Sequence, residues 1–236
     1  MEPQVLLRLA LEEAVALRRL NRFVVEATTQ SGTLRLHTRN TGKLLDLIYP
    51  GSRLLYSPRR TRKTAGLVVG VAVDGEEAAL IDPATQAAAF EEAWEKGLVG
   101  WLRGWRASKR EAWYRGSRID YGLEGPGGHG LLELKSAVYF SSEGLCMYPD
   151  TVSERGRRHV EALNEAARSG LRAIIAFIAA HPLCTGFRPC CEADPQFCAK
   201  LREAREVGVE VYATKIHLLL NGKVVLDSDN IPVRLE

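Results

Sequence analysis

The chain has 236 residues, and its 46% hydrophobic and 26% charged residues are an ordinary composition for a soluble globular protein with a substantial core. This length fits one large domain or two small ones. Near the N-terminus, Arg8, Glu12 and Glu13 interrupt the apolar run, which excludes a signal peptide or membrane helix there, and no other stretch is long enough to span a bilayer. We therefore expect a cytoplasmic protein without membrane association.

The formal net charge is only +3, but the charge is unevenly distributed. Residues 1–80 contain 12 Lys and Arg against 8 Asp and Glu, which leaves 20 against 21 for the rest of the chain, so the first part is the basic part. Its Ser57-Pro58 step indicates a loop within a cluster of cations at Arg53, Arg59, Arg60, Arg62 and Lys63. Because clustered cations neutralise backbone phosphates, we interpret the cluster as a phosphate-binding surface; the alternative is a solvated basic loop.

Residues 11–80 contain several apolar segments separated by turn signals. The segments are 23–27, 33–37, 44–48, 52–56 and 66–73, and the turn signals are Gln30-Ser-Gly, Asn40-Thr-Gly, Pro50-Gly and Asp74-Gly. Short strands at such intervals are typical of a small antiparallel barrel. The composition of residues 6–20, rich in Leu, Ala and Glu, favours a helix locally.

The pattern changes around Asp82-Pro83. A run of helix formers predicts a helix over residues 84–103, and we place the boundary between two domains, 1–81 and 82–236, before it. A strand over 109–114 follows. Two apolar runs, 118–123 and 131–138, then flank a loop rich in glycine and proline, which predicts a hairpin.

This hairpin brings charged side chains together. Asp120 lies on its first strand, and Glu133 and Lys135 lie on its second. Because side chains alternate across a strand, Glu133 and Lys135 share a face, and pairing of the strands brings Asp120 beside them. The sequence therefore predicts two carboxylates and an ammonium group in one small space.

Such a cluster suits Mg²⁺ or Mn²⁺, which take oxygen ligands, usually one or two carboxylates with water or substrate phosphate. Asp120 and Glu133 would hold the metal, and Lys135 would activate the attacking water and offset charge on a phosphodiester transition state. The alternative is a solvated carboxylate–lysine pair on an exposed strand. The spacing, an Asp followed 13 residues later by Glu-x-Lys, resembles the PD-(D/E)xK nuclease superfamily.

Downstream of the hairpin the pattern is that of an α/β domain with a mixed sheet. Helices are expected from Asp150 or Thr151 as cap to Gly170, and over 195–207 with Asp194 as cap. The apolar run 171–180 predicts a buried central strand, and 209–214 a closing strand. The tail, 216–236, contains a hairpin signal at Asn221-Gly222, and either domain could receive it.

Four cysteines fall within 15 residues, and a fifth, Cys146, lies apart from Cys184, Cys190, Cys191 and Cys198. None has C-x-x-C spacing, so the strong zinc signature is missing. Disulfides, free buried thiols and a metal site all stay open, and no organised motif indicates a nucleophilic cysteine.

Several short sequence motifs resemble those of the sugar fermentation stimulation protein family, SfsA. They are Asn21-Arg22-Phe23, Asn40-Thr41-Gly42, Glu111, Tyr114, Ser117-Arg-Ile-Asp120, Glu133, Lys135-Ser136, the run Tyr148–His159 and Gly208-Val-Glu-Val211. The resemblance covers nearly the whole chain, in order and spacing. It implies an N-terminal OB-like barrel, a PD-(D/E)xK restriction-endonuclease-like domain, DNA binding and a metal-dependent nuclease centre. It also implies a barrel strand near residues 14–17, so helix and strand both stay open for that segment.

The resemblance extends the candidate site beyond the hairpin. It implies that Glu111 completes the metal site and that Glu92 reaches it from the preceding helix, although either residue would also fit an exposed surface. In related nucleases the helix after the E-x-K strand borders the active site. The candidates on this helix for binding the phosphate or the metal-bound water are therefore Glu154, Arg155, Arg158 and His159. Arg118 is a phosphate-contacting or structural neighbour, because its guanidinium group stays protonated and cannot act as a base.

These observations predict a DNA-binding protein of α+β fold that hydrolyses phosphodiesters with Mg²⁺ or Mn²⁺ and contacts DNA through its backbone. One alternative is a DNA-binding or regulatory protein that kept the nuclease fold without catalysis. Another is a metal-dependent hydrolase of RNA or of a small phosphoester. The sequence leaves the formation of a homo-oligomer open.

Overall fold

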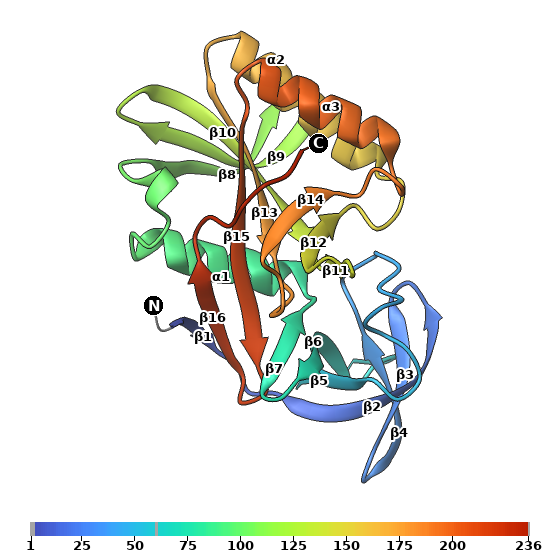
Figure 1. The fold of residues 1–236 in the computed structure, drawn as a ribbon. Helices are drawn as coiled ribbons and strands as arrows, with labels where there is room; N and C mark the ends of the chain where they lie inside the picture. The colour runs from blue at the N-terminus through green and yellow to red at the C-terminus, as the bar shows by residue number, and fades with distance from the viewer. Residues whose placement is uncertain (1–2, 60, 236) are drawn as a thin grey trace.

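The computed structural model describes residues 3–59 and 61–235. Within these ranges, 13 strands form one continuous sheet and 3 form a small second sheet. Residues 12–74 curl one end of the large sheet into a barrel, and the sheet continues into an open part that carries the helices (Figure 1). Among the helices of these ranges, none combines the length and the apolarity that crossing a membrane requires.

The N-terminal part is a closed barrel of β2 (Glu12–Asn21), β3 (Val24–Thr29), β4 (Gly32–His37), β5 (Arg53–Pro58) and β6 (Gly66–Asp74). The strands pair antiparallel in the order β4-β3-β2-β5-β6, and a parallel contact between β4 and β6 closes the ring. Side chains alternate along each strand, so Val25, Leu36, Leu54 and Val68 are completely buried inside. The predicted small barrel is confirmed.

The structure decides the conformation of the segment that the sequence left open. Residues 12–21 form a strand, because Ala14 and Ala16 point inward and alternate with exposed Val15 and Leu17. Pairing with β3 and β5 on both sides outweighs the local helix propensity of the segment.

The expected strand over residues 44–48 is wrong. The N–H groups of Leu47 and Ile48 both donate to the carbonyl oxygen of Leu44, at 3.1 and 2.8 Å, which forms a tight turn. Leu44, Leu47 and Ile48 are buried. The apolar run therefore reflects burial of a turn and not a strand.

The open sheet continues the barrel through β7 (Glu77–Leu80), β15 (Glu210–Leu219), β13 (Arg172–Ala179), β10 (Gly128–Ala137), β9 (Ser117–Gly125) and β8 (Arg106–Tyr114). β13 is parallel to both β10 and β15, whereas β8, β9 and β10 form an antiparallel meander. The predicted mixed sheet and its buried central strand are confirmed.

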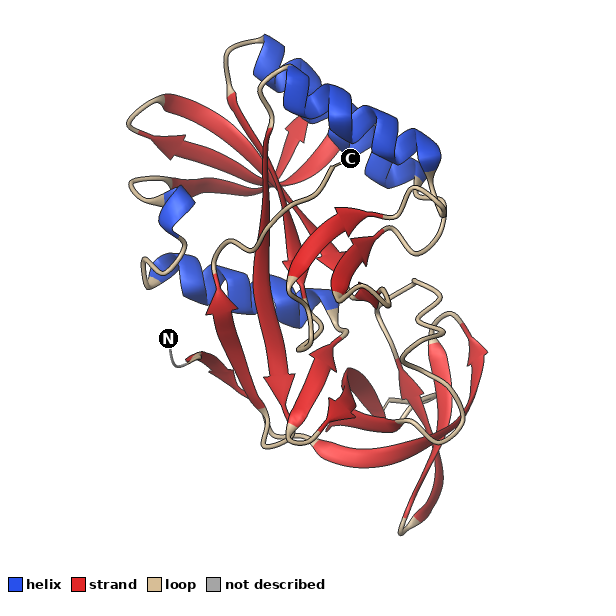
Figure 2. Cartoon of the chain, viewed as in Figure 1, coloured by secondary structure: helices blue, strands red, loops and turns tan. Residues whose placement is uncertain are grey.

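Helices cover both faces of this sheet (Figure 2). Ile174 and Ile178 of β13 join the core that contains Phe90 of α1 (Pro83–Glu95). Ile175 and Phe177 face the other way, into the core of α2 (Glu154–Arg168) and α3 (Pro195–Glu206). Burial on both faces explains why β13 is an uninterrupted apolar run.

Two helix boundaries differ from expectation. The helix predicted over 84–103 ends at Glu95, because Gly97 has a φ of +69° that a continuing helix does not allow, and a short 3-10 turn (Gly100–Leu102) follows. The cap of α2 is Ser153, whose hydroxyl accepts from the N–H of Gly156, and not Asp150 or Thr151. Asp194 caps α3 as predicted.

The C-terminal tail forms the expected hairpin, in which β16 (Lys223–Ser228) pairs with β15. On its other side β16 pairs with β1 (Gln4–Arg8), so the first strand of the chain lies beside the last one. Beyond the hairpin, Ile231 and Leu235 enter the core beneath α2 and α3. The tail therefore pairs with β1 and also packs into the core of the C-terminal domain.

The small sheet consists of β11 (Tyr139–Phe140), β12 (Leu145–Tyr148) and β14 (Gly186–Pro189). A disulfide joins Cys146 of β12 to Cys184, and a second joins Cys191 to Cys198. Cys190 is a free, buried thiol. Of the three alternatives that the sequence left open, disulfide formation is the one observed for these four cysteines.

Candidate active site

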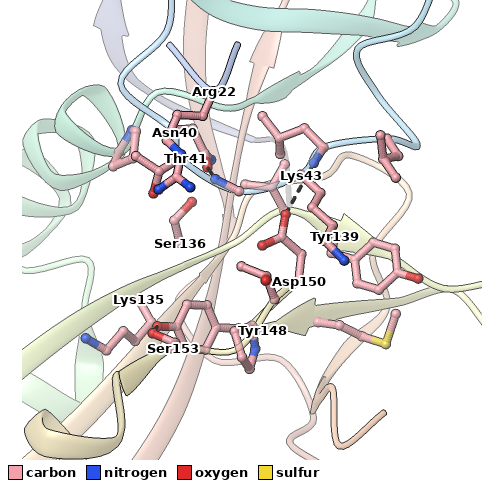
Figure 3. Close-up of a pocket in the computed structure, with 18 of the residues that line it drawn as sticks. Arg22, Asn40, Thr41, Lys43, Lys135, Ser136, Tyr139, Tyr148, Asp150 and Ser153 are labelled. Atoms are coloured by element: carbon pink, nitrogen blue, oxygen red, sulfur yellow. Dashed lines mark hydrogen bonds between the residues drawn. The ribbon is translucent and has the colours of Figure 1, made fainter. Parts of the chain in front are cut away.

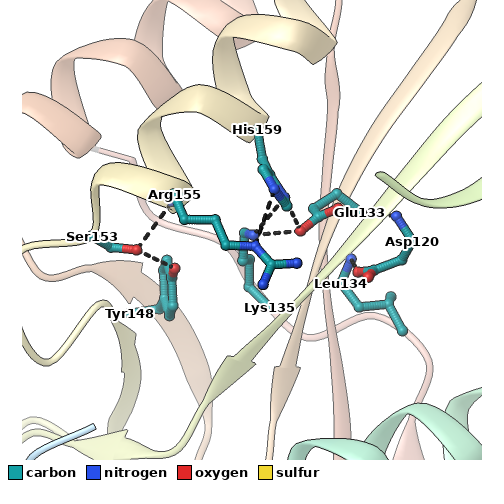
Figure 4. A network of polar contacts seen from close by, with 9 residues as sticks. Asp120, Glu133, Leu134, Lys135, Tyr148, Ser153, Arg155 and His159 are labelled. Carbon is teal, nitrogen blue, oxygen red and sulfur yellow. Dashed lines mark hydrogen bonds and ion pairs between the residues drawn. The ribbon is translucent and has the colours of Figure 1, made fainter. Parts of the chain in front are cut away.

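The β9–β10 hairpin places Asp120 and Glu133 side by side, as predicted. Leu132 pairs with Tyr121, which puts Asp120 opposite the next residue, Glu133. The N–H of Asp120 donates to Glu133 Oε2 at 3.1 Å, and the N–H of Leu134 donates to Asp120 Oδ2 at 2.8 Å (Figure 4). Each carboxylate is thus oriented by a backbone donor of the opposite strand.

Glu133 and Lys135 lie in the interior, with exposed fractions of only 2% and 8%. The Lys135 ammonium group donates to Glu133 Oε1 at 2.5 Å. His159 of α2 contacts the same oxygen through Nδ1, and this nitrogen lies 3.3 Å from Lys135 Nζ. Burial of a charge is tolerated when it is paired and hydrogen-bonded, and these contacts satisfy both conditions. The solvated-pair alternative is therefore wrong for Glu133 and Lys135.

The three ionisable groups of the hairpin respond differently to burial. Burial and the adjacent Glu133 charge raise the pKa of Asp120 to about 6. Burial alone would raise the pKa of Glu133, but Lys135 and His159 hold it below its ordinary value. Burial alone would lower the pKa of Lys135, but the Glu133 carboxylate raises it. At neutral pH the site therefore contains a stable ion pair beside a carboxylate whose charge is poorly compensated.

Two cavities meet at this site. A cavity of 240 Å³ is lined by Glu111, Asp120 and Lys135 and by residues of α1. A cleft of 760 Å³ lies between the barrel and the C-terminal domain (Figure 3). Both are lined by Pro83, Leu134, Lys135 and Ser136. The carboxylate site is thus reached from the larger cleft.

Glu111 lies in the same small cavity as Asp120, at a backbone φ of +52° that is unusual for a residue with a side chain. Its carboxylate is 65% exposed and lies 3.5 Å from the Arg118 guanidinium group. Glu92 of α1 pairs at 3.0 Å with Lys96, the residue that follows the helix, and lines neither cavity. Within residues 3–59 and 61–235, no three carboxylate, imidazole or thiolate side chains form a metal-binding group. Asp120 and Glu133 are two carboxylate residues in direct contact.

The N-terminal turn of α2 faces the hairpin. Arg155 Nε donates to His159 Nε2 at 3.3 Å, and the Arg155 charge lowers the pKa of Asp120 against the effect of burial. Glu154 and Arg158 are exposed. His159 was only one of several candidates from the sequence, yet it touches Glu133 directly. Its position four residues after Arg155, on the same helix face, was the available signal.

The cationic cluster after Pro58 lies elsewhere. Arg59 and Lys63 line cavities formed by barrel residues alone, Arg62 is exposed, and Arg60 lies outside the described residues. The cleft that leads to Asp120 is lined instead by cations that the sequence did not single out: Arg19, Arg22, Arg39 and Lys43. Arg22 does belong to the Asn21-Arg22-Phe23 motif, and this was the one sequence feature that pointed to a cation of the cleft.

Comparison with known proteins agrees with this architecture. Residues 17–81 match the family model of the SfsA N-terminal OB domain, and residues 84–222 match that of the sugar fermentation stimulation protein RE domain. A sugar fermentation stimulation protein homolog of Pyrococcus furiosus is 39% identical over 211 residues, covering 89% of this chain and 91% of the homolog. A homolog of Chloroflexus aurantiacus is 38% identical, covering 86% and 78%.

A solved structure of Pyrococcus furiosus SfsA in complex with Ca²⁺ superimposes with a TM-score of 0.92 at 36% identity, covering 98% of this chain and 99% of that one. The barrel, the mixed sheet and their order along the chain therefore agree with the solved structure. The chain belongs to the sugar fermentation stimulation protein family, SfsA.

Proposed function

We propose that this protein is a divalent-metal-dependent nuclease that binds DNA and hydrolyses its phosphodiester bonds. The observation that supports this most is the direct contact of half-buried Asp120 with buried Glu133, which is paired with buried Lys135. Asp120 and Lys135 line the small cavity that meets the cleft. Two adjacent carboxylates with a raised pKa at one of them form a site whose negative charge a cation would relieve.

The donor set fits Mg²⁺ or Mn²⁺. Such ions are commonly held by one or two carboxylates, with water and substrate phosphate as the other ligands, and Asp120 and Glu133 supply two. Glu111, in the same cavity, is our proposed third oxygen ligand. The Pyrococcus relative was solved with Ca²⁺, which also takes oxygen ligands. When bound, a divalent cation would supply Lewis-acid stabilisation of charge on the phosphoryl oxygens.

The residues of the chain would do the rest. The Lys135 ammonium group, kept charged by Glu133, would orient the attacking water and stabilise negative charge on the phosphate. His159 holds the Glu133 carboxylate in place. Arg155 would bind the scissile phosphate from the α2 side, because a guanidinium group presents several N–H donors to phosphate oxygens. The cations Arg118, Arg158, Arg59, Arg62 and Lys63 are further proposed contacts to DNA phosphates, and Glu154 is the proposed contact to metal-bound water.

The test is cleavage of linear, circular and single-stranded DNA in Mg²⁺ or Mn²⁺ by the wild type, Asp120→Ala and Lys135→Ala. We expect metal-dependent cutting that falls by about 10²-fold or more in both variants. Lys109→Ala is the matched control, because Lys109 is exposed on β8 and lines neither cavity. If the wild type binds DNA without metal and cuts none of the substrates, the protein is a non-catalytic DNA-binding protein with a nuclease fold.

A further inference from the structure

The 760 Å³ cleft has one wall from the barrel and one from the C-terminal domain. The barrel wall contributes residues 19, 21, 22 and 39–45. The other wall contributes residues of β10, β11 and β12 and the segment 149–153 that precedes α2. Figure 3 shows Arg22, Asn40 and Lys43 across the cleft from Lys135 and Ser136. The cleft therefore joins a cationic surface to the proposed catalytic centre.

The four cations of the barrel wall differ in their contacts. Arg39 is paired with Asp82, and its Nε donates to Oδ1 at 2.7 Å. Arg19 donates to the carbonyl oxygens of Arg22 and Asn40 at 3.0 and 3.3 Å, and to that of Lys43. Arg19 and Arg39 are thus occupied with holding the wall together.

Arg22 and Lys43 are the remaining cations of this wall. Both are exposed, and neither side chain has a hydrogen bond or ion pair within residues 3–59 and 61–235. Arg19 binds the backbone of both residues, so their positions are fixed while their charged groups stay free. Two positioned cations without partners, on the wall of a cleft, are suited to bind phosphate groups.

The size of the cleft limits what can enter it. Cavities of roughly 300–1,000 Å³ hold one drug-sized ligand, which corresponds to a nucleotide or two of a single strand and not to a duplex. The two walls are also bridged: Asp150 accepts from the N–H of Leu44 at 3.2 Å, and Asp46 accepts from the N–H of Phe140 at 3.2 Å. These bridges close the cleft on the side of residues 42–46.

The remaining features fit an unpaired strand. Tyr139 of β11 is half-buried in the cleft wall opposite the barrel, and base stacking on aromatic rings is a general feature of single-strand binding. Because Lys135 and Ser136 line both cavities, a strand in the cleft leads directly to the cavity of Asp120.

We propose that the cleft takes a single strand of nucleic acid, with Arg22 and Lys43 pairing with successive phosphates on the path to Asp120. The proposal deepens the proposed nuclease function by naming the form of its substrate, and it rests on that function for the role of Asp120. A duplex would have to be opened, or to offer a single-stranded end, before its backbone reached the site.

The test is fluorescence anisotropy of full-length protein in EDTA with a labelled single-stranded DNA of about 10 nucleotides, within the usual range for one OB fold. Binding of a single-stranded RNA and of a duplex DNA of the same length is measured in the same way. Arg22→Ala/Lys43→Ala is compared with Arg103→Ala/Lys109→Ala, which removes the same two kinds of charge from exposed positions outside both cavities.

We expect tight binding of the single strand, with the duplex at least tenfold weaker. The Arg22→Ala/Lys43→Ala variant should bind the single strand about tenfold more weakly, and its salt dependence should fall by about 1.4 in log–log slope, about 0.7 for each phosphate that no longer has a cationic partner. The control variant should stay within twofold of the wild type. The comparison of single-stranded DNA with single-stranded RNA identifies which type of nucleic acid binds more tightly.

Three results would overturn the proposal: no binding of single strands by the wild type, equal binding of the duplex, or equal reductions of affinity in the two double variants. A reduction only in Arg59→Ala/Lys63→Ala would also overturn it, because the strand would then follow the outer barrel surface. Since the assay contains no metal, these outcomes are independent of cutting. Single-strand binding through Arg22 and Lys43 in EDTA, together with no cleavage in the separate assay with Mg²⁺ or Mn²⁺, would leave this inference intact and refute the nuclease.

Discussion

At Asp120, burial and charge act in the same direction. The side chain accepts one backbone N–H, from Leu134, but the neighbouring charge with the largest effect on its pKa is the Glu133 carboxylate, which raises it. Lys135 and His159 contact Glu133 and leave Asp120 without a direct cationic partner in the described part of the chain. The ionised form of Asp120 is therefore disfavoured in the metal-free protein, as is common where a carboxylate is kept for catalysis and not for stability.

Asp120→Asn should stabilise the metal-free protein at pH 8, by on the order of 2 kcal/mol. The folded-state pKa of Asp120, about 6, lies above the ordinary 3.8. Between these two pH values the folded state holds a proton that the unfolded state has lost, and above about pH 6 the ionised carboxylate destabilises the folded state. Wild-type stability should fall as the pH rises from about 4 to about 6, and the gain from the substitution should vanish below about pH 4. Urea unfolding across this range measures both effects.

Adding Mn²⁺ in the same experiment tests the ligand role of Asp120. The ion should raise the urea midpoint of the wild type, because a ligand that binds only the folded state stabilises it. It should have little effect on Asp120→Asn. Equal stabilisation of the two proteins by Mn²⁺ would show that Asp120 is not a metal ligand.

At the scale of elements, Asp194 connects the two helices beside the site. Its carboxylate is fully buried and accepts from the N–H of Phe197 in α3, from the N–H of Ser153 at the start of α2, and from Arg157 Nε, each at 2.9 Å. Burial alone would raise the pKa of Asp194, but Arg157 and the two backbone donors hold it below its ordinary value. One side chain thus fixes the turn that carries Arg155.

Asp194→Ala should lower the free energy of unfolding by about 3–5 kcal/mol, because it removes a helix cap and leaves Arg157 without its buried partner. Glu203→Ala is the control, since Glu203 forms an exposed ion pair with Arg168 at 2.8 Å and should cost less than about 1 kcal/mol. Urea unfolding of both variants gives the comparison. Similar small reductions in stability would mean that α2 is positioned by core packing alone.

At the scale of the whole molecule, the barrel and the C-terminal domain are connected by a continuous sheet and by contacts across the cleft. Asp150 is central to these contacts. It accepts from Leu44 N–H, and a Cβ atom at Gly42 would lie 2.4 Å from its Oδ2, so only glycine allows this approach. The Asp150 carboxylate therefore helps to hold the loop of residues 40–45 against the C-terminal domain.

Asp150→Ala should release this loop and increase the rate of tryptic cleavage after Lys43 by roughly tenfold, because proteolysis follows the population of locally opened states. Asp74→Ala, at the exposed end of β6, should leave the rate unchanged. The measurement is limited proteolysis followed by mass spectrometry. An unchanged rate in Asp150→Ala would mean that the buried side chains of Leu44, Leu47 and Ile48 suffice to hold the loop.

The sequence by itself determined the features that depend on near neighbours in the chain. Alternation along two strands joined by a short turn placed Asp120, Glu133 and Lys135 together, because hairpin register is a local property. The uninterrupted apolar run of β13 indicated burial on both faces, because successive side chains of a strand point to opposite sides of the sheet. Asp194 before Pro195 marked the start of α3 through local capping chemistry.

Only the tertiary structure decided which distant residues meet. Residues 12–21 became a strand because β3 and β5 pair with them, and Cys146 found Cys184 at a sequence separation of 38. The free cations of the cleft are Arg22 and Lys43, while Arg59 and Lys63 face other cavities. A sequence records how many charges a segment carries, but the direction in which they point follows from packing between elements far apart in the chain.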